Sequence, residues 1–266
     1  MKTATLDRPM ESTPVTAPAD PPMKALVQGD SGTAQRRPTT LSVRRASIVA
    51  GTGYLLLSIL AGFGNYGVLA HFVTTGNAIK TANAITASRG LFLLGIGSLA
   101  AVAVLDVIVA VALLKVFSPV SKRLSRLAAG LRIVYAGVFA LAIYQLVGVL
   151  HVLGNANQAL QGVSAFNNIW NGGLMLFALH LLVLAYLAYK SGYVPKWLGI
   201  LIAVAGFGYF FDSLASVFSL GLTTKIASVT FIGEVALILW LLIKGRHIKL
   251  SDELASSPKY VPAVRS

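Results

Sequence analysis

Six long apolar stretches divide this chain and limit how it can fold. Each runs for at least 19 residues, and about 20 helical residues cross the hydrocarbon core of a bilayer. In lipid, only helices and closed barrels satisfy every backbone polar group, and unbroken apolar stretches favour helices over barrel strands. We therefore predict an all-α polytopic membrane helix bundle with six transmembrane helices, at about residues 46–73, 91–117, 128–152, 168–189, 197–220 and 226–244.

The charge content supports a membrane protein. Only 12% of the residues are charged and 56% are hydrophobic, whereas about 25% are charged in a typical soluble domain. The net charge of +13 is high, but the basic residues gather in short connections instead of on an accessible face with interleaved aromatic residues. We therefore predict no nucleic-acid partner. The absence of cysteine excludes disulfides, cysteine-ligated metals and cysteine nucleophiles.

The distribution of basic residues predicts the orientation of the helices, because cytoplasmic connections carry an excess of Lys and Arg. Alternate connections are rich and poor in these residues through every turn of the chain. The rich side holds Arg36, Arg37, Arg44, Arg45, Lys115, Lys122, Arg123, Arg126, Lys190, Lys196, Lys244, Arg246 and Lys249. The poor side holds Lys80, Arg89 and Lys225. We expect a multi-pass protein of the cytoplasmic (inner) membrane with both termini in the cytoplasm.

Three regions follow from this pattern. We predict that residues 1–44 form a disordered cytoplasmic tail. Most of this segment is rich in Thr, Pro, Ala, Asp and Ser and has no periodic pattern of apolar residues. Residues 45–245 form the six-helix transmembrane domain, and residues 246–266 form a cytoplasmic C-terminal tail. Two outer connections, 77–88 and 153–166, place apolar residues at three- and four-residue spacing. They predict two short interfacial helices on the outer membrane surface, or alternatively a cap tucked over the bundle.

Five ionisable side chains lie within the apolar stretches, where a charge costs about 2.5–3.5 kcal/mol on insertion scales. Asp106, His180 and Glu234 each lie nine or ten residues before the lysine that closes their stretch. At a rise of about 1.5 Å per residue, each is about 14–15 Å from that charge, near the middle of the membrane. If these faces point inward, the three groups converge.

The other two ionisable residues are offset in depth. Arg132 lies six residues after Arg126, and its side chain is long enough to reach the cytoplasmic surface or to meet Asp106 or Glu234. Asp212 lies sixteen residues after Lys196, in the outer half.

Our first hypothesis is a polar site that binds or translocates a small ligand or a proton. It consists of Asp106, His180 and Glu234, with Arg132 as charge partner and Asp212 at an outer entrance. The alternative is structural, because polar side chains also join membrane helices at about 0.6 kcal/mol per hydrogen bond.

The sequence contains none of the common catalytic motifs that would indicate an enzyme class. The sequence contains no H-E-x-x-H, G-x-S-x-G or phosphate-binding P-loop, so we predict no cofactor and no resident metal, and whether the chain is an enzyme stays open. Asp106, His180 and Glu234 do offer nitrogen and oxygen ligands, so an intramembrane metal-dependent hydrolase acting on lipid is one alternative function. A non-catalytic membrane scaffold or regulator is another. The predicted partners are the lipid bilayer and a small-molecule or proton ligand, with no oligomeric state fixed by the pattern.

Several stretches carry a family resemblance. The most specific is SGYVPKWLGIL at residues 191–201, and it is supported by Leu105–Leu113, Leu131-Arg132, Leu179-His180, Gly208-Tyr209 and Asp212-Ser213. Over about residues 45–245 the chain resembles an uncharacterised bacterial family of integral membrane proteins, domain of unknown function 4386. The resemblance implies a multi-helix inner-membrane protein and no particular activity. Its stretches include every intramembrane ionisable residue named above except Glu234.

Overall fold

The computed structural model describes residues 40–218 and 226–248, which belong to one compact unit. Every regular element in these ranges is helical, which confirms the all-α prediction. The elements are α1 (Thr40–Gly62), a π-helical segment (Phe63–Leu69), α2 (Ala70–Phe72), α3 (Ala78–Ala87), α4 (Arg89–Phe117), α5 (Lys122–Val149), α6 (Ala156–Lys190), α7 (Lys196–Val217), α8 (Ala227–Thr230), α9 (Ile232–Ile243) and a final 3₁₀ turn (Gly245–His247).

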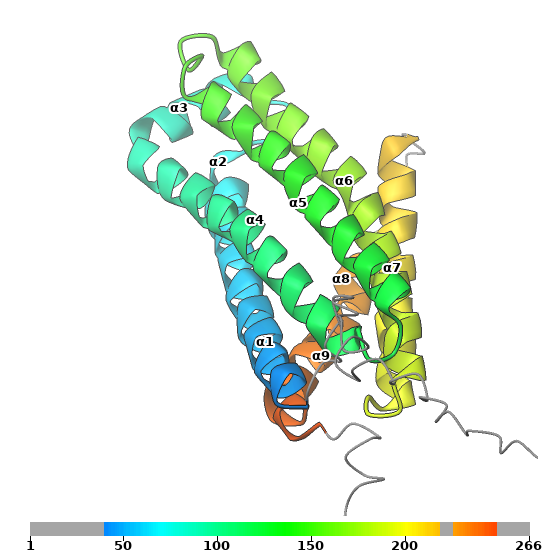
Figure 1. The fold of residues 1–266 in the computed structure, drawn as a ribbon. Helices are drawn as coiled ribbons and strands as arrows, with labels where there is room; N and C mark the ends of the chain where they lie inside the picture. The colour runs from blue at the N-terminus through cyan, green and yellow to red at the C-terminus, as the bar shows by residue number, and fades with distance from the viewer. Residues whose placement is uncertain (1–39, 219–225, 249–266) are drawn as a thin grey trace, which may run out of the picture. The chain divides into compact units, whose positions relative to one another are not determined.

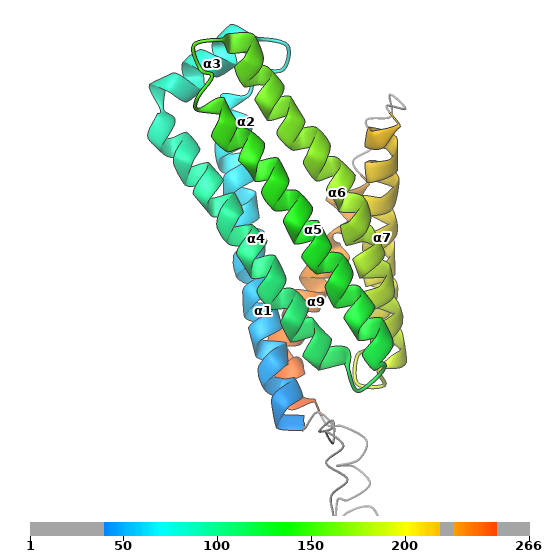
Figure 2. The same ribbon diagram turned by 45° about the horizontal axis from the view of Figure 1, so that its top comes forward.

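Six of these helices pack side by side as a closed ring. Along the chain, α1 contacts α4, α4 contacts α5, α5 contacts α6, and α6 contacts α7. The ring closes through α9, which contacts both α7 and α1. Figures 1 and 2 show α5 and α6 running side by side, with α1 and α9 at the opposite face of the bundle. A side chain that points inward from any of these helices therefore faces the same interior.

The number of membrane spans differs from the prediction. Five helices within the described residues are long and apolar enough to cross a membrane, and they include α1 with its π-helical extension, α4, α5, α6 and α7. The sixth predicted stretch, 226–244, is interrupted at Phe231 between α8 and α9. The 12 residues of α9 extend only about 18 Å, less than the hydrocarbon thickness of about 30 Å. Six spans are therefore not confirmed.

The two segments predicted as interfacial helices, 77–88 and 153–166, have different structures. The first is a separate helix, α3, which buries Ala82 and Ile85 and packs against α6, as a cap on the bundle would. The second predicted interfacial helix, 153–166, is wrong as a separate element because α6 is continuous from Ala156 to Lys190. The Asn155 side chain caps α6 by accepting a hydrogen bond from the Gln158 N–H at 3.2 Å, and nothing breaks the helix after it.

The boundaries of the two tails also shift. Helix α1 begins at Thr40, so residues 40–44 are helical and do not belong to a disordered tail. Residues 246–248 are ordered against α1, because Arg44 Nε donates a hydrogen bond to the Ile248 carbonyl at 2.8 Å. The remaining predictions for 1–39 and 249–266 fall outside the described residues.

Residues 191–201, the most specific stretch of the family resemblance, form the turn after α6 and the first residues of α7. Gly192 has a φ of +73°, which favours glycine, and the following turn leads to Pro195 at the start of α7. The Tyr193 hydroxyl donates a hydrogen bond to the Val116 carbonyl of α4 at 2.6 Å. Burial in this contact raises the pKa of Tyr193, because it disfavours the charged phenolate.

The bundle exposes apolar side chains and buries charged ones, the reverse of a soluble protein. Val104 and Leu141 are each 62% exposed on the outward faces, whereas Arg132 and His180 are fully buried. Lipid accommodates exposed apolar side chains, while an isolated charge in lipid is costly. Together with the five long apolar helices, this pattern defines a multi-pass membrane protein.

Candidate functional site

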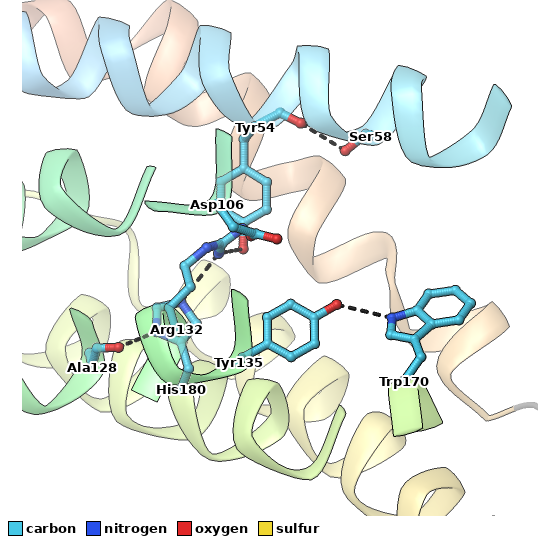
Figure 3. A network of polar contacts seen from close by, with 8 residues as sticks. All are labelled: Tyr54, Ser58, Asp106, Ala128, Arg132, Tyr135, Trp170 and His180. Carbon is cyan, nitrogen blue, oxygen red and sulfur yellow. Dashed lines mark hydrogen bonds and ion pairs between the residues drawn. The ribbon is translucent and has the colours of Figure 1, made fainter. Parts of the chain in front are cut away.

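Arg132 of α5 is the centre of a polar cluster inside the ring (Figure 3). Its side chain has no exposed surface, and Nη2 lies 2.6 Å from Asp106 Oδ1 of α4. Nη1 donates a hydrogen bond to the Tyr54 hydroxyl of α1 at 2.6 Å. The same nitrogen lies 3.4 Å from His180 Nε2 of α6. Arg132 therefore turns into the bundle toward Asp106, and does not reach for the membrane surface.

Two aromatic rings enclose the guanidinium. Its central carbon lies 4.3 Å from the ring centroid of Tyr54 and 5.2 Å from that of Phe177. A cation over an aromatic face gains about 2 kcal/mol when both are shielded from water. These rings replace part of the solvation that Arg132 loses by burial.

The contacts of His180 define its protonation. Nδ1 lies 2.8 Å from the Ala128 carbonyl, which can only accept, so Nδ1 carries the proton. Nε2 faces Arg132, which can only donate, so Nε2 must present its lone pair. The neutral ring with hydrogen on Nδ1 satisfies both neighbours.

The ion pair itself is incompletely hydrogen bonded. Arg132 Nη2 and Asp106 Oδ1 are close, but their alignment does not give a hydrogen bond. Within the described residues, Arg132 Nε also lacks a partner. A buried polar atom left unpaired costs about 1–3 kcal/mol, so each such atom needs a physical explanation.

Glu234 and Tyr209 complete the cluster. The Glu234 carboxyl of α9 faces the hydroxyls of Tyr209 and Tyr54 and interacts electrostatically with Arg132 and Asp106. It is less enclosed than the other ionisable members, being half-buried. Each helix of the ring therefore supplies one member: Tyr54 from α1, Asp106 from α4, Arg132 from α5, His180 from α6, Tyr209 from α7 and Glu234 from α9.

Asp212, the fifth predicted site residue, has a different environment. It lies one turn beyond Tyr209 on α7, and its Oδ1 accepts a hydrogen bond from the Ile226 N–H at 3.1 Å. That contact ties α7 to the residue preceding α8. The structure thus brings together Asp106, Arg132, His180 and Glu234, and places Asp212 at a helix connection.

An aromatic column extends from the cluster between α5 and α6. Phe177 packs against Tyr135, whose ring stacks on Phe139 with centroids 6.1 Å apart. Trp170 Nε1 donates a hydrogen bond to the Tyr135 hydroxyl at 3.1 Å (Figure 3). The column gives the guanidinium a rigid aromatic wall on one side.

The surroundings limit what the cluster can hold. Among the described residues, no group of three or more His, Asp or Glu side chains could hold a metal ion. The metal-dependent alternative therefore has no supporting site in this part of the chain. A small void beside His180, lined by Ser125 and Ala128, has no room for a water molecule.

The sequence did not lead us to assign Tyr54, Tyr209 or Phe177 to the site, although Tyr209 lies in one of the stretches that carry the family resemblance. Tyr54 lies nine residues after Arg45, the same spacing that singles out Asp106 before Lys115. Depth counting extended to hydroxyl groups would therefore have found it. The interaction of Phe177 with a cation carries no comparable signal, because a phenylalanine in an apolar helix is usual.

Fold and cluster together define a class: a multi-pass helical membrane protein with one charged centre buried inside a ring of helices. The model of a family described as domain of unknown function (DUF4386) matches residues 49–245. The chain belongs to this family, as its sequence resemblance predicts. An uncharacterized protein of Archaeoglobus fulgidus is 43% identical over 155 residues, covering 58% of this chain and 84% of the relative. No solved structure matches the chain.

Proposed function

We propose that this membrane protein binds and moves protons through the cluster at the centre of its bundle. The proposal rests on one observation: a permanently charged side chain, Arg132, is fully buried among two carboxyl groups, one imidazole and two phenol hydroxyls from different helices. Ionisable groups inside a membrane are expensive and mark functional sites by default. Arg132 Nε, which lacks a partner among the described residues, supports this, because a purely structural pair gains from complete hydrogen bonding.

Charge balance suggests how the cluster handles a proton. Arg132 supplies one positive charge, which compensates one carboxylate. Asp106 and Glu234 share that single cation, so the second carboxyl is less costly when it is protonated. When Arg132 exchanges one carboxylate partner for the other, the proton changes sites. Binding and release of one proton then accompany a switch of ion-pair partner.

The hydroxyl of Tyr54 lies between Arg132 and the Glu234 carboxyl. It accepts a hydrogen bond from Arg132 and faces Glu234, so its own proton is available to that carboxylate.

We further propose that the protein lies in the cytoplasmic membrane with both termini in the cytoplasm. Lys122, Lys190 and Lys196 stand at the connections α4–α5 and α6–α7, while Lys80 and Arg89 belong to the connection at the other end. This asymmetry supports the orientation through the positive-inside rule. The hydrogen bond from Arg44 to the Ile248 carbonyl supports termini on one side, because it joins the start of α1 to the residues after α9.

Proton flux into reconstituted vesicles tests the proposal. Full-length protein is placed in liposomes with a trapped pH dye, and a potassium gradient with valinomycin drives protons inward. We expect Glu234→Gln, which keeps the shape and removes the titratable group, to reduce flux to that of protein-free vesicles. Asp212→Asn, which removes a carboxylate outside the cluster, should leave flux unchanged. Equal flux in the Glu234→Gln variant and the parent would contradict the proposal.

A membrane scaffold is the second candidate function, and the tight packing beside His180 favours it. In that case the cluster only joins helices. Parent vesicles would then take up protons no faster than empty ones, and Glu234→Gln would change thermal stability alone.

A further inference from the structure

A groove of about 550 Å³ lies between α1 and α4, on the lipid-facing side of these helices. Its volume falls within the range of about 300–1,000 Å³ that is typical of ligand sites. Apolar side chains form its walls, with Val49 on α1 and Val107, Ile108 and Val111 on α4. All four are exposed on the bundle surface, so whatever surrounds the helices has access to them.

Two basic side chains line one end of the groove. Arg45 stands in the second turn of α1, and Lys115 stands in the last turn of α4. Both are exposed, and no acidic residue is among the side chains that line the groove. The groove therefore combines a long apolar wall with a positively charged end.

We infer that this groove binds one anionic phospholipid, with its acyl chain along the apolar wall and its phosphate against Arg45 and Lys115. The helices on both sides are membrane-spanning, so lipid is the solvent of the groove. Basic side chains at a membrane surface select anionic headgroups through charge attraction. The site is distinct from the proton cluster, because Asp106 on α4 points into the bundle while its neighbours Val107 and Ile108 face the groove.

Lipid binding to the purified full-length protein tests the headgroup contact. Native mass spectrometry in detergent would compare phosphatidylglycerol with phosphatidylcholine of the same acyl chains. Each basic side chain contributes about 1 kcal/mol to anionic-lipid attraction, so the double variant Arg45→Gln/Lys115→Gln should bind phosphatidylglycerol about 30-fold more weakly. The charge-matched control Arg126→Gln/Lys190→Gln, in exposed residues outside the groove, should bind like the parent.

A second pair of variants tests the apolar wall. Val111→Trp places a bulky ring in the groove and should weaken phosphatidylglycerol binding. Val104→Trp adds the same ring to an exposed position of α4 outside the groove and should have no effect. These substitutions leave both charges in place, so they remain informative if the double glutamine variant fails to fold.

Four results would overturn the inference. One is equal binding of both lipids by the parent. Another is an equal loss of phosphatidylglycerol binding in Arg45→Gln/Lys115→Gln and in the control Arg126→Gln/Lys190→Gln. The third is competition by inorganic phosphate or glycerol phosphate as strong as by the lipid itself, which would assign the charges to a soluble anion. A dimer that disappears in Val111→Trp would assign the groove to a second copy and would also reject a lipid site.

Discussion

Replacing Asp106 by Asn should destabilise the protein strongly while barely changing its shape. The substitution leaves the fully buried Arg132 guanidinium without the carboxylate 2.6 Å away, and the remaining carboxyl group, Glu234, faces the hydroxyls of Tyr54 and Tyr209 instead of forming a direct ion pair with it. Arginine stays protonated, so the charge cannot be relieved by losing a proton. Removing one partner of a buried ion pair costs about 3–5 kcal/mol. The rings of Tyr54 and Phe177 are present before and after the change, so they do not reduce this difference.

The reverse substitution, Arg132→Met, should cost less. The stranded carboxyl of Asp106 can take up a proton and become neutral, although the Tyr54 hydroxyl and His180 Nε2 each lose a donor. In the double variant Asp106→Asn/Arg132→Met neither half of the ion pair is left charged, and Glu234 can take up a proton. The double variant should therefore lose at least about 2 kcal/mol less than the sum of the two single losses, within the range found for contacting residues.

Unfolding in detergent, followed by tryptophan fluorescence, measures these values. Trp170 reports on the interior because its indole is hydrogen bonded to Tyr135 beside the cluster. A loss of 3–5 kcal/mol corresponds to a fall in Tm of about 6–20 °C for a chain of this size. The control cycle pairs Arg132→Met with Asp212→Asn and should be additive within about 0.5 kcal/mol. An additive Asp106–Arg132 cycle would refute the reasoning.

Two further predictions concern packing and orientation. Gly233→Ala should lower stability by about 1–3 kcal/mol in thermal unfolding, because its Cβ would overlap the Leu201 carbonyl of α7. The control Gly97→Ala meets nothing within 4 Å and should be neutral, so equal effects would contradict close α7–α9 packing. Green fluorescent protein fused after Ser266 should fluoresce, and alkaline phosphatase at the same position should be inactive; an active phosphatase there would reject the proposed orientation.

The sequence predicts which ionisable residues belong to the cluster better than it predicts which of them contact one another. Depth in a membrane helix is set by residue count, at about 1.5 Å per residue from a charge that must stay in water. This places Asp106, His180 and Glu234 at one level before any tertiary information. Which side of each helix faces the bundle interior depends on the neighbouring helices. The sequence of α4 is apolar on all sides, so it does not show which side faces inward. Only the structure therefore shows that Arg132 forms its ion pair with Asp106 and not with Glu234.

Helix boundaries were predictable only where a local signal was decisive. The start of α6 is marked by one side chain, that of Asn155, which caps the helix. The sequence of its first turns contains many polar residues, so the sequence alone suggests a separate surface helix there. The break at Phe231 has no Pro or Gly at that position, so the sequence reads as one apolar stretch. Close packing of Gly233 on Leu201 brings α9 against α7 there, and that is a tertiary effect.

The environment of Arg132 explains why the cluster must form as a unit. Insertion of an arginine into a membrane helix costs up to about 2.5–3.5 kcal/mol, and each contact of the shielded cation with an aromatic face stabilises it by about 2 kcal/mol. Tyr54 comes from α1 and Phe177 from α6, so both faces are present only when these helices and α5 are assembled. Burial of the cation therefore stabilises the closed ring, and the closed ring makes burial of the cation possible. A movement of α9 that withdrew Glu234 would change the charge balance around Arg132 directly. The same physical coupling that holds the helices together would then link proton binding at a carboxyl group to helix movement.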